Sequence, residues 1–156
     1  MLQKIISGAQ TGADQAALLA AHSQKYEIGG WMPEGFKTED GPRPSFQHKY
    51  GMEETKSFPN YRNRTQRNVI DSDGTLWFGN PTSPGGKLTI NSARKHKRPV
   101  LIIPRDATTF DAERKIITWI RKEEIETLNV AGNRASKNPD IYGFVYMVML
   151  RVLKNI

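Results

Sequence analysis

The sequence contains no cysteine, which excludes disulfide bonds and metal sites built on thiolates. It also lacks any apolar run approaching the roughly 20 residues that a membrane-spanning helix needs. Its three histidines, His22, His48 and His96, are widely separated and have no cysteine partners, so no zinc site is expected. The chain starts directly with a strand candidate rather than a signal-peptide pattern. We therefore expect a cytoplasmic protein with no membrane partner.

The length and the charge set broad limits on the fold and on the partner. A chain of 156 residues is most simply one domain, spanning residues 1–156. Its 23 lysines and arginines outnumber 16 aspartates and glutamates, which gives a formal net charge of +7. Such an excess fits an anionic partner, either a small phosphorylated molecule or a nucleic acid. A basic surface that is merely solvated would give the same count.

Apolar runs alternate with helix-forming segments along the chain. Strands are predicted at residues 3–7, 27–31, 75–79, 99–104 and 127–131. Helices are predicted at residues 13–25, 88–96, 111–124 and 139–153. This alternation predicts an α/β fold, with a single Rossmann-like three-layer domain, a mainly parallel five-stranded sheet and helices on both faces.

The order of these strands across the sheet can be narrowed by the rules for parallel sheets. We expect the order 27–31, 3–7, 75–79, 99–104 and 127–131, with a ligand crevice beside residues 3–7. The continuous apolar run at 99–104 is typical of a strand buried on both faces. Residues 32–68 are rich in proline, glycine and charge, and we interpret them as a long functional loop containing at most a short helix.

The segment between the first strand and the first helix is the strongest candidate binding site. Its glycines permit tight turns and close backbone approach, and the helix start directs N–H groups and a dipole at one point. The candidate ligand-binding residues here are Ser7, Gly8, Gln10, Thr11, Gly12 and Asp14. A plain turn capped by Thr11 and Asp14 is the alternative. The spacing matches neither the Walker A motif nor Gly-x-Gly-x-x-Gly.

Two further polar, glycine-containing turns follow predicted strands. The first begins a helix after strand 75–79 and is a second candidate anion site, with Gly85, Gly86, Lys87 and Thr89 as its residues. A simple glycine-rich helix start is the alternative there. The second follows strand 127–131, at the edge where clefts form in open α/β sheets. Its candidate ligand-binding residues are Asn129, Gly132, Arg134, Ser136 and Lys137.

Three other positions carry weaker signals. Arg64 and Asn68 are one helical turn apart and would face one ligand if this segment is helical, although a solvated basic segment fits equally well. Trp31 follows a strand and can stack on a ring or pack in the core. Asp71 and Asp73 can hold Mg²⁺, but we favour a turn because Asp-Gly before a strand is a common turn pattern.

Taken together, these segments resemble one known family over nearly the whole chain. The matching motifs are Ser-Gly-Ala-Gln-Thr-Gly-Ala-Asp (7–14), Gly-Gly-Trp-Met-Pro-Glu-Gly (29–35), Glu-Asp-Gly-Pro (39–42), Arg-Thr-x-x-Asn-Val-x-Asp-Ser-Asp-Gly-Thr-Leu (64–76), Gly-Gly-x-Leu-Thr (85–89) and Leu-Asn-Val-Ala-Gly-x-Arg-x-Ser-Lys (128–137). In this order they are similar to the putative molybdenum carrier family, a circularly permuted, YpsA-like branch of the SLOG Rossmann-like superfamily.

The resemblance implies a nucleotide or nucleotide-like ligand. It places Gly8, Gln10, Thr11, Gly12, Asp14, Gly85, Gly86, Asn129, Gly132 and Arg134 along the ligand site. In the related lonely-guy phosphoribohydrolases, the motif Pro-Gly-Gly-x-Gly-Thr-x-x-Glu ends in a catalytic glutamate. Here that stretch is residues 84–92, and the glutamate position is Ser92. Serine has no useful pKa for general acid–base catalysis, which argues against lonely-guy hydrolysis.

These patterns favour a protein that binds or carries a phosphorylated nucleotide-like or pterin-like ligand. The molybdenum cofactor is one candidate, because a basic cleft suits its phosphate and its anionic metal end. The alternatives are a nucleotide-processing hydrolase, in which Asp14 or the pair Asp71 and Asp73 supplies the acid, the base or a metal site, and a binder of single-stranded nucleic acid. Nucleic acid is less favoured because few aromatic residues accompany the basic segments. The apolar helix 139–153 can support a homo-oligomer or simply cover the sheet.

Overall fold

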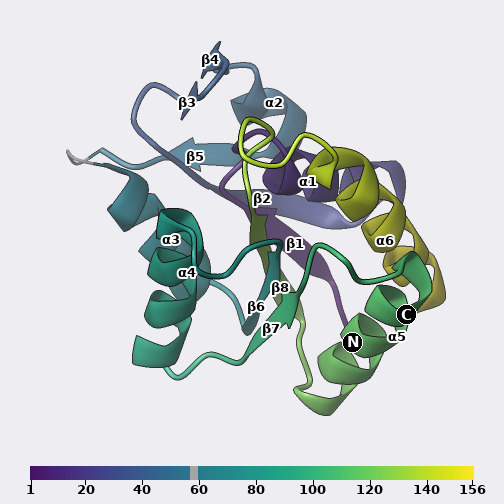
Figure 1. The fold of residues 1–156 in the computed structure, drawn as a ribbon. Helices are drawn as coiled ribbons and strands as arrows, with labels where there is room; N and C mark the ends of the chain where they lie inside the picture. The colour runs from purple at the N-terminus through teal and green to yellow at the C-terminus, as the bar shows by residue number, and fades with distance from the viewer. Residues whose placement is uncertain (57–59) are drawn as a thin grey trace.

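The computed structural model describes residues 1–56 and 60–156, with the backbone alone at residues 60 and 61. It has the α/β architecture that the sequence predicts, with a parallel sheet between two layers of helices (Figure 1). The sheet strands are β1 (Lys4–Ser7), β2 (Glu27–Met32), β5 (Met52–Glu54), β6 (Gly74–Phe78), β7 (Val100–Ile103) and β8 (Thr127–Gly132). The helices are α1 (Ala13–Ser23), α2 (Phe46–Tyr50), α3 (Asn60–Ile70), α4 (Pro84–Lys95), α5 (Thr109–Lys122) and α6 (Ile141–Asn155).

The strand order is β5-β2-β1-β8-β6-β7, and every neighbouring pair is parallel. The expected order was wrong in one respect, because the last strand, β8, inserts between β1 and β6 rather than at the edge. Handedness rules restrict crossovers but do not fix which gap a late strand enters. Strand β7 is instead an edge strand. Its apolar run reflects helices α4 and α5, which cover its two faces, and not a central position.

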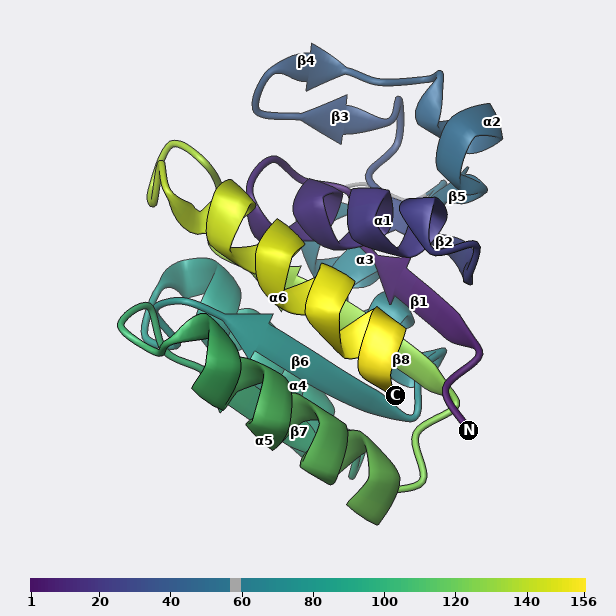
Figure 2. The same ribbon diagram turned by 90° about the vertical axis from the view of Figure 1, so that its right-hand side faces the viewer.

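The helices divide between the two faces of the sheet. Helices α1, α5 and α6 cover one face of the sheet, and α3 and α4 cover the other (Figure 2). The first layer packs on Ile5, Leu76, Phe78, Leu128 and Val130, all fully buried. The alanines of α1 are fully buried as well, which lets α1 and α6 approach closely. This apolar side supplies most of the hydrophobic stabilisation and holds the sheet in position.

Helix α6 mainly covers the sheet. Val145, Val148 and Met149 are fully buried, and Phe144 and Tyr146 pack partly against the same core. Met147 is half exposed. Helix α6 therefore fits the alternative in which it covers the sheet, and a homo-oligomer stays a prediction.

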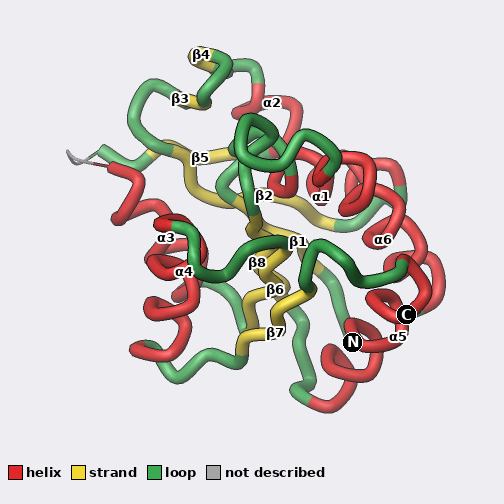
Figure 3. Tube along the Cα trace, in the orientation of Figure 1, coloured by secondary structure: helices red, strands yellow, loops and turns green. Residues whose placement is uncertain are grey.

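The segment 32–68 is not an irregular loop in its described parts. It contains a small antiparallel hairpin, β3 (Lys37–Thr38) and β4 (Gly41–Pro42), followed by α2, by the sixth sheet strand β5 and by the start of α3 (Figure 3). Residues 57–59 of this predicted loop lie outside the described residues. The segment folds around a second apolar cluster that includes Met32, Phe36, Tyr50 and Met52. Short elements of two to five residues carry too little periodicity to be recognised in a sequence.

Candidate functional site

A cavity of about 320 Å³ lies at the carboxyl ends of the central strands, on the side of the sheet covered by α3 and α4. Parallel strands ending together create such a crevice, with the loops above it free to carry polar groups. Eleven of the eighteen candidate residues line this cavity. They are Gly8, Gln10, Asp14, Arg64, Asn68, Gly85, Thr89, Asn129, Gly132, Arg134 and Lys137. Segments far apart in the sequence therefore come together here.

The register of two neighbouring strands positions the cavity floor. Thr75 pairs with Asn129, and Trp77 pairs with Ala131. Side chains two residues apart on a strand share a face, so Asn129 and Trp77 both point to the α3–α4 side, and both line the cavity. Trp77 was not among the candidates. The signal that could have identified it is its place near the end of a buried strand, two residues after Thr75 and therefore on the same face as Thr75 and Asn129.

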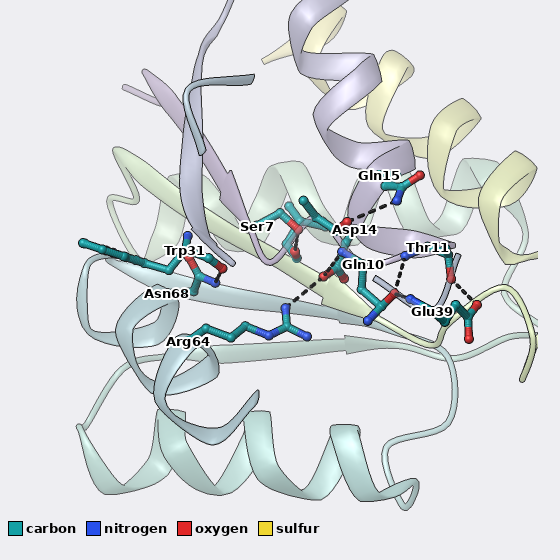
Figure 4. Close-up of polar contacts among 11 residues, drawn as sticks. Ser7, Gln10, Thr11, Asp14, Gln15, Trp31, Glu39, Arg64 and Asn68 are labelled. Carbon is teal, nitrogen blue, oxygen red and sulfur yellow. Dashed lines mark hydrogen bonds and ion pairs between the residues drawn. The ribbon is translucent and has the colours of Figure 1, made fainter. Parts of the chain in front are cut away.

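The turn after β1 brings a buried ion pair to the cavity wall. Arg64 Nη1, from α3, lies 3.4 Å from Asp14 Oδ2 in the first turn of α1 (Figure 4). Burial raises the pKa of Asp14 above the ordinary value, and the charge of Arg64 and hydrogen bonds from backbone groups of Gln10 and Gly132 offset only part of this effect. The carboxylate accepts a hydrogen bond from the Gln10 backbone N–H at 3.3 Å. Asp14 therefore occupies the anion position at the start of α1.

Two glycines in this turn are required by close approach. A Cβ on Gly8 would lie 1.4 Å from Arg64 Nη1, so the guanidinium occupies the space a side chain would take. Gly12 has φ +80°, and a Cβ there would lie 2.5 Å from the backbone oxygen of Asn133. Gly8 therefore makes room for a cation, while Gly12 allows the two loops after β1 and β8 to meet.

Three neutral side chains that line this cavity each carry a buried polar atom with no hydrogen-bond partner within the described part of the chain. The atoms are Gln10 Nε2, Trp77 Nε1 and Asn129 Oδ1. The three side chains are only 4%, 3% and 1% exposed, respectively. A buried polar group without a partner costs about 1–3 kcal/mol. Because native proteins keep few such groups, three of them around one cavity point to a site that a polar ligand completes.

Glu39, at the tip of the β3–β4 hairpin, joins the loops above the cavity. Its carboxylate accepts a hydrogen bond from the hydroxyl of Thr11 (Figure 4). It also accepts hydrogen bonds from the backbone N–H of Ser136 at 3.2 Å and from the Ser136 hydroxyl. Partial burial raises the pKa of Glu39, but these hydrogen bonds and the charge of Arg134 outweigh burial, and the pKa is lowered overall. Thr11 and Ser136 therefore hold the loops together rather than line the cavity.

The other candidates outside the cavity have structural contacts. Ser7 Oγ donates to the backbone oxygen of Val130 at 2.7 Å, inside the sheet. Gly86 donates its N–H to the N-cap Ser83 of α4, and Lys87 is exposed. Gly12 lies where the loop after β1 contacts the loop after β8. None of these side chains or positions lines the cavity.

Trp31 points away from the cavity (Figure 4). Its Nε1 donates to Asp71 Oδ2 at 2.7 Å, and the Arg67 guanidinium lies 4.6 Å from its ring centroid. Asn68 holds the backbone of the same tryptophan through hydrogen bonds of 2.8 and 3.0 Å, so its amide is committed although it lines the cavity. Arg64 and Arg67, both on α3, therefore point to different places, Arg64 toward Asp14 and Arg67 toward Trp31.

The two aspartates considered for Mg²⁺ serve the turn before β6. Asp73 Oδ2 accepts hydrogen bonds from the backbone N–H groups of Glu126 and Thr127 at 3.1 and 2.8 Å. Asp71 is engaged by Trp31. Among residues 1–56 and 60–156, no group of three or more His, Cys, Asp or Glu side chains is placed to hold a metal ion. No helix in this part of the chain is long and apolar enough to cross a membrane.

The fold and the cavity define a Rossmann-like α/β protein with a crevice at the ends of its strands. The chain belongs to the circularly permutated YpsA SLOG family, whose model matches residues 5–153. It is also similar to a protein of Syntrophus aciditrophicus SB solved by crystallography at 1.45 Å, which is described as "Putative molybdenum carrier protein". That similarity has 40% sequence identity and a TM-score of 0.89, and covers 97% of this chain and 94% of the other. No curated protein matches the chain.

Proposed function

We propose that this protein binds a small phosphorylated ligand, nucleotide-like or pterin-like, in the cavity at the strand ends, and acts as a binding or carrier protein. The observation that carries the proposal is the charge balance of the cavity wall. Arg64, Arg134 and Lys137 contribute three cations, against one carboxylate, Asp14. An anion placed among these cations would gain charge-assisted hydrogen bonds.

The start of α4 supports the same proposal. Pro84 and Gly85 line the cavity, so the positive end of this helix dipole lies at the cavity wall. At the start of α1, by contrast, the Asp14 carboxylate already takes the anion position. The phosphate of a ligand therefore fits best between the start of α4 and the loop that carries Arg134 and Lys137.

A molybdenum cofactor fits these residues as cargo held by its organic part. The chain has no cysteine to ligate the metal, and the cavity offers cations for a phosphate together with neutral polar groups for a pterin ring. Arg134 and Lys137 would hold the phosphate, and Gln10, Trp77 and Asn129 would face the ring. This proposal is in line with the description of the Syntrophus protein as a molybdenum carrier.

Thermal unfolding in the presence of phosphorylated nucleotides, a molybdopterin source, inorganic phosphate and molybdate tests this function. A ligand at 100 times its dissociation constant adds about 2.7 kcal/mol of stability, which corresponds to roughly 5–10 °C in Tm for a domain of this size. We expect the shift to disappear in Arg134→Ala and to persist in Arg121→Ala, which changes an exposed arginine of α5. A shift that survives in Arg134→Ala, or no shift with any ligand, would contradict the proposal.

A second candidate function is hydrolysis of a nucleotide-like ligand, favoured by the raised pKa of Asp14 in the cavity. Perturbed carboxyl groups in clefts are frequent acids or bases in catalysis. Incubation of the protein with a panel of nucleotides, with and without Mg²⁺, would detect turnover. Turnover that Asp14→Asn abolishes would support this function. No turnover across the panel would contradict it, and binding would remain as the proposed function.

A further inference from the structure

Three neutral side chains of the cavity, Gln10, Trp77 and Asn129, carry buried polar atoms that binding of a phosphate by the cations would not satisfy. Gln10 Nε2 and Trp77 Nε1 are hydrogen-bond donors, and Asn129 Oδ1 is an acceptor. All three belong to side chains that are more than nine-tenths buried and line the cavity. A phosphate offers only acceptors at neutral pH once its oxygens are ionised, so it cannot satisfy the Asn129 oxygen.

Each of the two amide side chains uses its other polar atom in hydrogen bonds within the chain. Gln10 Oε1 accepts hydrogen bonds from the backbone N–H groups of Thr11 at 3.1 Å and Glu39 at 2.8 Å, which leaves Nε2 as the amide atom for a ligand. Asn129 Nδ2 donates to Thr75 Oγ1 at 3.2 Å, which leaves Oδ1. Trp77 carries a single N–H. The protein therefore offers two donors and one acceptor.

We infer that Gln10, Trp77 and Asn129 recognise the lactam edge of a planar heterocycle, a ring carbonyl beside a ring N–H, as in hypoxanthine, guanine and pterin rings. This inference rests on the proposed function and specifies the ligand class. A carbonyl oxygen has two lone pairs and can accept from both Trp77 and Gln10, while the adjacent N–H donates to Asn129. The ring would lie against the apolar surfaces of Leu88 and Ala131, which line the same cavity.

An adenine-type edge is a poorer match to these atoms. It offers one ring nitrogen as acceptor beside an amino group, so one of the two protein donors stays without a partner. Sites built to hydrogen-bond a ligand group reject analogues that leave buried protein groups unpaired. Inosine 5′-monophosphate and adenosine 5′-monophosphate differ at this edge and share the ribose and the phosphate, so their comparison isolates the recognition of the edge.

Calorimetric titration of the full chain with these two nucleotides and with ribose 5-phosphate tests the inference. We expect inosine monophosphate to bind at least tenfold more tightly than adenosine monophosphate. Trp77→Phe, which removes the N–H and keeps an aromatic ring, should weaken inosine monophosphate about tenfold and leave ribose 5-phosphate unchanged. Trp31→Phe is the matched control, because that indole N–H is bound to Asp71 outside the cavity.

The outcomes separate this inference from the proposed function. Equal affinities for the two nucleotides, both lost in Arg134→Ala, would overturn the lactam assignment and leave phosphate binding intact. Equal weakening of inosine monophosphate and ribose 5-phosphate by Trp77→Phe would also overturn it, since the tryptophan would then act on the cavity as a whole. If none of the three compounds binds, the inference fails for purine nucleotides, and the thermal unfolding test with a molybdopterin source then decides the proposed function.

Discussion

The guanidinium of Arg64 lies 3.4 Å from the carboxylate of Asp14 and fills the space where residue 8 would carry a side chain. Both side chains are largely buried, with 12% and 5% of their surfaces exposed. Gly8 thus determines where a cation lies in the cavity wall. This relationship links a glycine of the first turn to a helix more than fifty residues later in the chain.

Gly8→Ala should displace Arg64 while the fold is kept. The atom that meets the new methyl group is the far end of a flexible side chain, so the guanidinium can move aside. We expect affinity for a phosphorylated ligand to fall about tenfold, equivalent to about 1.4 kcal/mol. Titration calorimetry measures this change, and circular dichroism serves as the control for folding. Unchanged affinity would show that Arg64 has no part in binding.

Asp14→Asn should change how stability depends on pH. The folded state raises the pKa of Asp14, so the protonated form is favoured by folding. The contribution of the protonated form to the free energy of unfolding is complete below the ordinary pKa of 3.8. It is lost as the pH rises through the raised pKa of the folded state. Asparagine cannot ionise, and we expect urea unfolding of the variant to show a flatter stability profile above pH 3.8 than the original protein. An unaltered profile would mean that Asp14 does not titrate in this way.

Gly12→Ala should be strongly destabilising. The substitution places a side chain at φ +80° and only 2.5 Å from a backbone oxygen, and backbone atoms cannot move aside cheaply. We expect a loss of about 2–4 kcal/mol, in the range of strained or overpacked sites. Gly143→Ala in α6 is the matched control, because nothing lies within 4 Å of the new methyl group. That control should be neutral or stabilising by up to about 1 kcal/mol.

Glu39→Gln should loosen the loops above the cavity. The Glu39 carboxylate accepts one hydrogen bond from Thr11 and two from Ser136, each worth about 1 kcal/mol, and a neutral amide would weaken them. Amide hydrogen exchange should then accelerate about tenfold or more in residues 10–12 and 134–137. In the original protein, the pKa of Glu39 is lowered, so the contact persists above the ordinary value of 4.5 and weakens as the pH falls through the lowered one. Unchanged exchange would contradict this role.

Glu113→Gln tests an ion pair remote from the cavity. Glu113 accepts from Arg151 Nε at 2.6 Å and from Asn155 Nδ2 at 2.7 Å, joining α5 to α6. The hydrogen bond from Asn155 lowers the pKa of Glu113 most, with Arg151 adding to the effect. We expect a loss of about 1 kcal/mol at pH 7 that vanishes as the pH falls below the lowered pKa. Glu123→Gln, at the partly exposed pair with Lys122, should change stability little.

The sequence predicted the fold class and the turns that meet at one edge of the sheet, but not the order of the strands. Polar glycine-containing turns after strands identified the regions around Gln10, Gly85 and Arg134, since the ends of parallel strands meet at one edge. The position of β8 could not be predicted, because packing across the sheet decides which gap it fills. Trp77 and Glu39 escaped notice for a similar reason. The roles of both depend on long-range contacts, Trp77 through strand register and Glu39 through a hairpin of two-residue strands.

The most direct test of the account is to follow the indole N–H groups by two-dimensional ¹H–¹⁵N NMR during addition of inosine 5′-monophosphate. The chain has three tryptophans, and Trp77→Phe assigns the resonance of the one in the cavity. The account predicts that the Trp77 resonance moves in a saturable way, while those of Trp31 and Trp119 stay nearly fixed. A stationary Trp77 resonance, with larger shifts at either of the others, would show that the ligand does not enter the cavity at the strand ends.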